Sequence, residues 1–278
     1  MLNRASKPFV KLVERYLPDP YIFVLLLTLI TFAFAVVIQN QSPLTTIRQW
    51  GDGFWGLLTF SMQMLLVLVT GFMLACTPLV KALLERLASL AKSPGSAIVL
   101  VTLVSLIASW INWGFGLVVG ALFAKALARK VSVDYRLLVA SAYSGFIVWH
   151  GGLAGSVPLT NATPGHFSEA QIGVIGTSET IFSGFNLLLL AIMFVVIPLV
   201  NRLMLPPKAE SVIVDSAKLQ DDALPSATNE RPADRLENSK ALGLLVGFAG
   251  LAYLTNYFIS GGGLNLNIVN TLFLFLAI

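Results

Sequence analysis

Long runs of apolar residues, separated by short polar segments, dominate the pattern along this chain. Uninterrupted runs cover residues 21–38, 54–76, 180–201 and 241–258, and another begins at residue 264. A helix needs about 20 apolar residues to cross a bilayer, so each complete run predicts a membrane-spanning helix. Before residue 21, basic residues alternate with apolar ones, which predicts an amphipathic helix at the membrane surface that ends at Pro18 and Pro20. The pattern indicates an all-α polytopic membrane protein.

Composition and charge support this class. Hydrophobic residues make up 56% of the 278 residues and charged residues only 12%, which excludes an ordinary soluble domain. The net charge of +4 does not indicate nucleic-acid binding, because the basic residues cluster at the ends of the predicted helices. The single cysteine, Cys76, excludes a disulfide framework within the chain.

The apolar run at residues 97–124 is interrupted at its centre, residues 109–114, by polar residues and glycine. Basic clusters flank it on both sides, with Lys81, Arg86 and Lys92 before it and Lys125, Arg129, Lys130 and Arg136 after it. Lys and Arg normally collect on the cytoplasmic side of a membrane, and a single crossing would place one of the two clusters on the opposite side. We therefore expect a re-entrant hairpin whose arms of about 13 residues carry the tip roughly 20 Å, to near mid-bilayer. Irregular backbone at that depth must be buried in protein or line a wet cavity, which is typical of transporters.

A second interrupted segment covers residues 137–160, which are free of Asp, Glu, Lys and Arg and rich in glycine and serine. We expect a half-helix up to residue 149, an unwound centre at Gly151 and Gly152, and a second half-helix near residues 153–160. Ser156 precedes Pro158 as an N-cap residue precedes an early helical proline. Discontinuous helices of this kind form mid-membrane binding sites in transporters.

The charge pattern also predicts the domain organisation. Residues 206–240 hold seven of the 14 acidic residues and no sustained apolar period, which predicts a solvated cytoplasmic linker. We expect residues 1–205 to form a first transmembrane repeat and residues 241–278 to begin a second, truncated one, because the last apolar run stops without a flanking anchor. Outside the linker only Arg48 falls on the outer side, so we expect a cytoplasmic N-terminus. An inverted repeat needs an odd number of crossings, and four precede the linker. Either the first helix lies outside the repeat, or the hairpin is not re-entrant.

No Asp, Glu, Lys or Arg lies inside any predicted span. An anion at mid-membrane would therefore be stabilised by helix N-termini, backbone N–H groups and neutral polar side chains. We expect this site between the hairpin tip and the broken helix, with Asn112 capping the second arm. The candidate substrate-binding residues are Ser109, Asn112, Gly114, Ser144, Gly151, Gly152 and Ser156. The alternative is that these glycines and serines only permit close helix packing and that Asn112 only caps a kink.

His150 is the one titratable residue besides tyrosine at the predicted membrane depth. Imidazole titrates near neutral pH, so His150 is a candidate for carrying a coupled proton. The competing interpretation is a neutral histidine bonded to a backbone carbonyl freed at the glycine break. Trp110, Trp113 and Trp149 are candidates for lining an acyl-chain pocket, or for packing and interfacial roles.

Three separated motifs resemble the bacterial short-chain fatty acid transporter family. They are residues 16–23 (YLPDPYIF), 109–117 (SWINWGFGL) and 150–159 (HGGLAGSVPL). The resemblance implies an inner-membrane carrier of short-chain carboxylates within a broad ion-transporter superfamily, whose members use re-entrant hairpins and broken helices. Family members are longer than 278 residues, which agrees with a truncated second repeat. The resemblance assigns no binding residues.

We therefore expect a secondary transporter, not an enzyme, that moves acetoacetate or butyrate across the inner membrane with coupled H⁺ or Na⁺. The absence of buried acids favours Na⁺, held by carbonyl groups at the helix breaks. The alternatives are a carrier or channel for other small carboxylates such as C4-dicarboxylates and, more remotely, an intramembrane acyl-transfer enzyme with His150 as base. We expect no metal site, no organic cofactor and no nucleic-acid partner. The expected partners are the substrate and the lipid bilayer. The sequence does not decide whether the protein forms a homo-oligomer.

Overall fold

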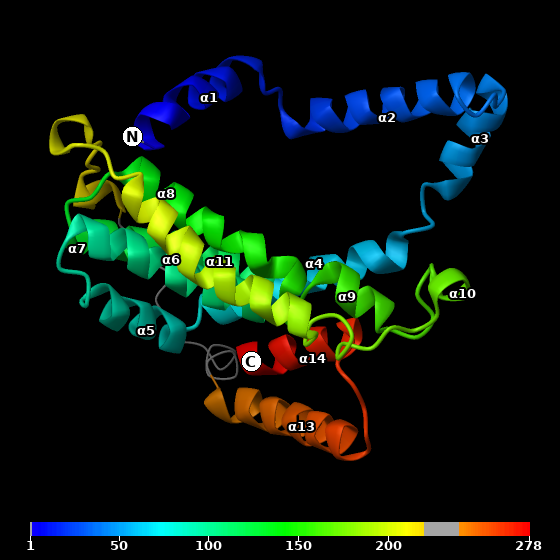
Figure 1. Cartoon of the computed structure of the whole chain (residues 1–278). Helices are drawn as coiled ribbons and strands as arrows, with labels where there is room; N and C mark the ends of the chain where they lie inside the picture. The colour runs from blue at the N-terminus through cyan, green and yellow to red at the C-terminus, as the bar shows by residue number, and fades with distance from the viewer. Residues whose placement is uncertain (1, 220–238) are drawn as a thin grey trace, which may run out of the picture. The chain divides into compact units, whose positions relative to one another are not determined.

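The computed structural model describes residues 2–219 and 239–278, and these residues form helices and loops without a strand (Figure 1). The all-α class predicted from the sequence is confirmed. The chain forms two compact units, residues 1–62 and 63–278. The described helices are α1 (Leu2–Tyr16), α2 (Pro20–Val37), α3 (Pro43–Gly53), α4 (Leu58–Ala75), α5 (Pro78–Ala88), α6 (Pro94–Ile111), α7 (Trp113–Lys130), α8 (Tyr135–Ser144), the 3₁₀ helix η1 (Gly145–Gly151), α9 (Ser156–Asn161), α10 (Glu169–Ile172), α11 (Gly184–Leu203), the short 3₁₀ turns η2 (Lys208–Glu210) and η3 (Ser216–Leu219), α13 (Lys240–Ile259) and α14 (Leu266–Ala277).

The first unit contains helix α1, the apolar helix α2 and the short helix α3, which packs on α2. Asp19 begins α2 by accepting the N–H of Tyr21 at 2.8 Å, and Pro20 occupies the first helical position, where its missing N–H costs nothing. Ser42 and Pro43 begin α3 in the same way. Between the apolar runs at residues 21–38 and 54–76 the sequence shows only a short polar segment, and this cap explains why the structure has a helix there.

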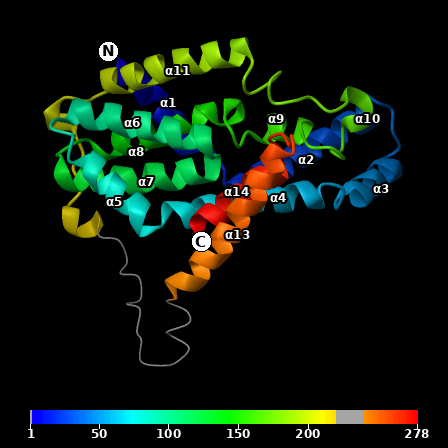
Figure 2. The same ribbon diagram turned by 90° about the horizontal axis from the view of Figure 1, so that it is seen from below.

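The second unit is built around the antiparallel pair α6 and α7 (Figures 1 and 2). Ser109 lies against Gly116 and Ser105 lies against Gly120. The contacting residue number falls along α6 as it rises along α7, which shows that the two helices are antiparallel. A methyl group at Gly116 would overlap the backbone of Ser109. Helices in lipid associate mainly through such close packing of small residues, because apolar burial alone provides little drive there.

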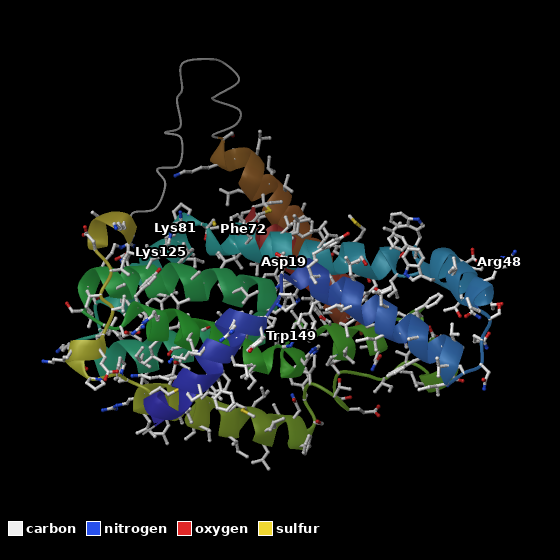
Figure 3. All side chains as sticks on the ribbon, turned by 90° about the horizontal axis from the view of Figure 1, so that it is seen from above. Asp19, Arg48, Phe72, Lys81, Lys125 and Trp149 are labelled. Atoms are coloured by element: carbon white, nitrogen blue, oxygen red, sulfur yellow. The ribbon has the colours of Figure 1, made fainter. Side chains whose placement is uncertain are left out.

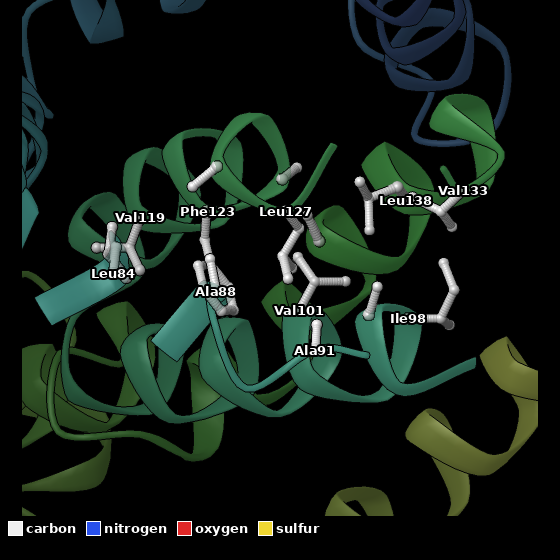
Figure 4. Packing of buried hydrophobic residues seen from close by; sticks show 14 of the residues in the cluster. Leu84, Ala88, Ala91, Ile98, Val101, Val119, Phe123, Leu127, Val133 and Leu138 are labelled. Carbon is white, nitrogen blue, oxygen red and sulfur yellow. The ribbon is translucent and has the colours of Figure 1, made fainter. Parts of the chain in front are cut away.

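An apolar core joins α5, α6, α7 and α8 (Figure 4). Phe123 and Leu127 of α7 and Val101 of α6 are fully buried in it, together with Leu138 of α8. Both arms of the hairpin have 18 residues, and both extend beyond the apolar run at residues 97–124. At 1.5 Å per residue an arm is about 27 Å long. The re-entrant path of this pair through a membrane stays a prediction.

The segment at residues 137–160 changes helix type along its length. The α-helix ends at Ser144, five residues earlier than predicted, and the 3₁₀ helix η1 continues to Gly151. Ser105 donates a hydrogen bond to the carbonyl of Ala142, the group that an α-helical N–H of Phe146 would use. Because that acceptor is taken and Gly145 packs directly on Ser105, the chain leaves α geometry at this point.

Within residues 2–219 and 239–278, six helices are long and apolar enough to cross a membrane. They are α2, α4, α6, the combined segment Tyr135–Asn161, α11 and α13, and α14 is a shorter apolar helix. Charged residues inside these helices lie only in end turns: Arg136, Arg202 and Lys240. The chain is therefore a multi-pass membrane protein.

The segment predicted to be a solvated linker is partly packed in the structure. Asp134 accepts the N–H of Val212 at 2.8 Å, and the N–H of Tyr135 donates to the carbonyl of Val212 at 2.9 Å. Arg129 donates to the carbonyl of Leu219 at 3.0 Å, and Leu219 is buried. These long-range bonds hold residues 208–219 against α7 and α8. Residues 220–238 of the predicted linker lie outside the described residues.

Candidate functional site

The hairpin tip consists of a single residue, Asn112, between α6 and α7. Its backbone is extended, with φ −155° and ψ 127°, and its side chain is fully buried. The side-chain Oδ1 accepts the N–H of Phe115 at 2.9 Å, which confirms the predicted N-cap of α7. The first-turn N–H groups of Trp113 and Gly114 have no partner inside the helix, so the positive end of the α7 dipole lies at the tip.

Glycines let α4 approach the tip more closely than any other residue would. A methyl group at Gly71 of α4 would lie 2.5 Å from the backbone nitrogen of Phe115 and 2.8 Å from Oδ1 of Asn112. One at Gly114 would lie 2.7 Å from the Cα of Leu68. The two backbones therefore touch, and Gly114 is a packing residue of the tip as well as a candidate binding residue.

The end of η1 reaches the other side of the tip. The N–H of Leu153 donates to the carbonyl of Trp110 at 2.7 Å, and Gly152 lies directly on that carbonyl. Gly151 lies against the start of α11, where Asn186 donates to its carbonyl at 3.0 Å. Gly152 therefore contacts the tip directly, whereas Gly151 contacts α11 instead.

Two serines differ from their predicted positions. Ser156 is the first residue of α9 and Gly155 is the N-cap, because Gly155 packs on the carbonyl of His150 in an extended conformation. Ser144 donates to Ser141 at 2.7 Å and accepts from Asn201 at 2.8 Å. Asn201 also donates to Thr102, about three turns below the tip. The structure therefore does not bring Ser144 to the tip.

Several buried polar atoms on the elements around the tip have no hydrogen-bond partner among the described residues. They are the hydroxyls of Ser109 and Ser156, Nδ2 of Asn112, Nε1 of Trp113 and Oδ1 of Asn270; the hydroxyl of Ser141 in α8 shares this property. Buried polar groups are normally paired, and an unpaired one costs about 1–3 kcal/mol. The amide orientations of Asn112 and Asn270 are set by their other atoms, since Oδ1 of Asn112 accepts the cap bond and Nδ2 of Asn270 donates to the carbonyl of Gln63 at 3.1 Å. The elements around the tip therefore present neutral donors, and α14 presents one oriented acceptor.

An aromatic cluster adjoins this polar group. The rings of Trp113 and Trp149 lie 5.7 Å apart, and Phe146 lies 4.8 Å from Trp149 (Trp149 is labelled in Figure 3). The ring of His150 is 3.8 Å from that of Trp149, and His150 is exposed. Its side chain has no hydrogen bond within the part of the chain that the structure describes, so the backbone-bonded neutral histidine considered from the sequence is not present.

No fixed charge occurs in the segments that build the tip, which are α4, residues 93–124, residues 137–168 and α14. Among the described residues, no group of three or more His, Cys, Asp or Glu could hold a metal ion. The arrangement can therefore hold a small anion only through neutral N–H and O–H donors and the start of α7.

Sequence reasoning missed the contribution of α14. Asn270 and Asn267 both contact Gln63 of α4, with Nε2 of Gln63 donating to Oδ1 of Asn267 at 2.7 Å. Asn270 is one turn before Phe273, whose ring lies 6.5 Å from that of Phe115 at the tip. Asparagines inside an apolar helix are costly in lipid and are the signal that would have identified this face.

Comparison with known proteins shows which family this chain resembles. A family model described as short chain fatty acid transporter matches residues 1–278. A protein of Escherichia coli (strain K12), provisionally named a short-chain fatty acid transporter, is 45% identical over 99% of this chain and 63% of its own length. A protein of Haemophilus influenzae (strain Rd) with the same provisional name is 40% identical over 99% of this chain and 64% of its own length. The chain thus spans slightly less than two thirds of these relatives. No solved structure matches it.

Proposed function

The chain belongs to the short-chain fatty acid transporter family, and from this premise we propose that it is a secondary transporter of short-chain monocarboxylates such as acetoacetate or butyrate. It moves them across the bacterial inner membrane, with its N-terminus in the cytoplasm, and does not convert them chemically. The observation that carries the proposal is the buried, uncharged hairpin tip with its unpaired polar atoms.

The number of unpaired donors around the tip matches the needs of one carboxylate. A carboxylate has two oxygens with about four acceptor positions. Nδ2 of Asn112, Nε1 of Trp113 and the hydroxyls of Ser109 and Ser156 supply donors for them. Binding by neutral donors without a salt bridge is weak enough for release, which a transport cycle needs.

The aromatic cluster favours a short apolar tail over a second carboxylate. Trp113 contributes both its N–H and a face of the cluster that it forms with Phe146 and Trp149. A C4-dicarboxylate would place a second charge against these rings, and no cation in the tip-forming segments compensates for it. We therefore propose monocarboxylates as the substrates.

An anion in this uncharged site moves more easily with a cation. Among the unpaired buried side-chain atoms of the described residues, Oδ1 of Asn270 in α14 can only accept, so it favours a cation or a protonated group rather than the carboxylate itself. Coupling to Na⁺ would use this oxygen and nearby carbonyls, whereas coupling to H⁺ would use His150. We propose symport, with Na⁺ as the first candidate and H⁺ as the second.

Substrate access requires a conformational change. Ser109 is 1% exposed, Asn112 is not exposed and Ser156 is 6% exposed, so the tip is closed. The contacts that close it come from Gly71 of α4, Phe273 of α14 and Leu153. We propose that alternating access separates the tip from α4 and α14 in turn.

The test is uptake of labelled butyrate and acetoacetate into proteoliposomes that contain the complete protein. An inward Na⁺ gradient and an inward H⁺ gradient are imposed separately, and succinate is the dicarboxylate comparison. Concentrative uptake of the monocarboxylates under either gradient supports the proposal and identifies the ion. Uptake that no gradient can concentrate would indicate a channel, and uptake of succinate alone would contradict the proposed substrate class. Product analysis of the lumen tests for chemical conversion.

A further inference from the structure

The end of the hairpin away from the tip holds a cavity of about 660 Å³ that the transport site does not use. Its walls come from three stretches of chain. They are the loop before α6, the end of α7 with the loop to α8, and residues 205–213 after α11. The cavity is lined by Ala91, Lys92, Pro94, Lys130, Val131, Ser132, Val133, Asp134, Leu205, Pro206, Lys208, Ser211 and Ile213.

Each of the three stretches contributes one lysine, and each stretch is fixed by hydrogen bonds. The backbone N–H of Lys92 donates to Ser96, which belongs to the capping box of α6. Lys130 is held by Glu85, at 3.0 Å from the carboxylate and 2.6 Å from the backbone carbonyl. Lys208 is positioned because Asp134 and Tyr135 bind Val212 four residues later. The backbone positions from which Lys92 and Lys208 line the cavity, and the side chain of Lys130, are therefore held by hydrogen bonds.

The acid that lines the cavity does not cancel this charge. Asp134 accepts from Arg136 at 2.9 Å and from the N–H groups of Leu137 and Val212, so its carboxylate is already satisfied. The ammonium groups of Lys92 and Lys208 have no hydrogen-bond or ion-pair partner in the described ranges 2–219 and 239–278. Pro94 places the N-terminal turn of α6, a positive helix end, on the same wall.

Apolar walls adjoin the lysines. Leu205, Val131, Val133 and Ile213 line the cavity, and the apolar body of α6 begins at Ala97. Lysines next to the end of an apolar membrane helix lie at the depth of lipid headgroups, where they attract anionic lipids. A ligand with an anionic head and an apolar tail matches both parts of the lining.

We propose that this cavity binds a phosphate group, carried by the headgroup of an anionic phospholipid or present as a free anion. Lysine is a common phosphate ligand that acts as a point charge. Lys92 and Lys208 contact the phosphate, and Lys130 adds to the field while it remains paired with Glu85. The proposal does not depend on which substrate the transporter carries.

The experiment titrates the purified complete transporter in detergent with short-chain phosphatidylglycerol, phosphatidylcholine or inorganic phosphate, and follows the thermal unfolding temperature. Phosphatidylglycerol is expected to raise this temperature and phosphatidylcholine to leave it unchanged. The double variant Lys92→Gln/Lys208→Gln is expected to bind phosphatidylglycerol about 25-fold more weakly, or about fivefold for each lysine near an anionic group. The matched control, Lys81→Gln/Lys218→Gln, removes two lysines that do not line the cavity and is expected to bind like the wild type.

The two sources of phosphate are separated by the third ligand. If phosphatidylglycerol raises the unfolding temperature at concentrations where inorganic phosphate neither raises it nor displaces the lipid, the occupant is a lipid. If phosphate alone gives the full shift at similar concentration, the occupant is a free anion. Binding that is equal in the two double variants, or equal for the two lipids, overturns the proposal. Since both substituted lysines are exposed, the variants should fold, and loss of wild-type binding on raising the NaCl concentration gives a second readout.

Discussion

Substitution of Asn112 separates the two functions that the hairpin tip combines. Oδ1 of Asn112 caps α7, whereas Nδ2 is unpaired and is proposed to bind the carboxylate. Alanine removes both groups. Serine keeps a good N-cap acceptor but has no amide donor. The pair Asn112→Ala and Asn112→Ser therefore reports on the cap and on the donor independently.

The structure gives the expected size of each effect. Loss of an N-cap costs about 0.5–2 kcal/mol, and we expect the upper end for Asn112→Ala because the freed N–H of Phe115 is buried beside Gly71. Loss of a hydrogen bond to a charged group costs about 1.5–3 kcal/mol, which corresponds to a KM for butyrate raised about 10- to 150-fold in both variants. Asn112→Ser should thus unfold at nearly the wild-type temperature and still bind poorly.

The assay measures initial uptake rates in proteoliposomes over a range of butyrate concentrations, together with thermal unfolding in detergent. Ser93→Ala is the matched control, because Ser93 caps the other end of α6 by accepting the N–H of Ser96 at 3.2 Å. It should lower stability by about 1 kcal/mol and leave KM unchanged. A wild-type KM in Asn112→Ser would refute the proposed role of Nδ2 and leave Asn112 as a cap alone.

Three further predictions follow from packing, charge and coupling. Gly116→Ala should lower the unfolding temperature, at a cost of about 1–3 kcal/mol, because the added methyl group meets the backbone of Ser109. Gly184→Ala is the control and should be nearly neutral, because the space around Gly184 is open. Equal effects of the two substitutions would show that the α6–α7 contact is not tight. Burial raises the pKa of Asp134, but hydrogen bonds from Arg136, Val212 and Leu137 outweigh this and hold it below its ordinary value. Its stabilising effect is therefore present above pH of about 3.9 and lost as the pH falls through the lowered pKa, so the difference in unfolding temperature between wild type and Asp134→Ala should be constant near neutrality and shrink below about pH 4. His150→Gln should abolish any uptake driven by a pH gradient and spare uptake driven by Na⁺; unchanged pH-driven uptake would exclude His150 as the proton carrier.

The sequence predicted the features of the tip that depend on local chemistry. Asn112 at a helix start, glycines after it and the absence of charge on both sides are properties of a few neighbouring residues, and the cap follows from them. The break was predicted over residues 109–114, and the structure narrows it to Asn112 alone. The family resemblance, carried by three motifs, is confirmed by the match over the whole chain.

Features that depend on distant partners were not predictable in this way. Ser144 is a small polar residue in an apolar segment, which made it a candidate binding residue. In the structure, Asn201, 57 positions away, donates a hydrogen bond to its hydroxyl. Asn270 joins α14 to α4 by donating to Gln63, 207 positions away. The polar composition of residues 208–219 predicted a solvated linker, yet Asp134 and Arg129 bind its backbone. In each case a tertiary hydrogen bond decides which polar group is satisfied, and no local pattern contains that information.

The one-residue junction at Asn112 couples the two arms of the hairpin, so we expect them to move as one body. The N–H of Asn112 donates to the carbonyl of Ala108 at 2.9 Å, and its own carbonyl accepts from Gly116 at 2.8 Å, so a single residue belongs to the hydrogen-bond ladders of both arms. A bend at this junction would break the helical hydrogen bonds of one arm, because no loop residue separates the two arms. A displacement at the basic end of the pair is therefore carried over the length of an arm, about 27 Å, to the atoms at the tip. The proposed phosphate cavity and the proposed carboxylate site lie at opposite ends of this hairpin, so under the two proposals a phosphate group bound at one end would bear mechanically on the opening of the other.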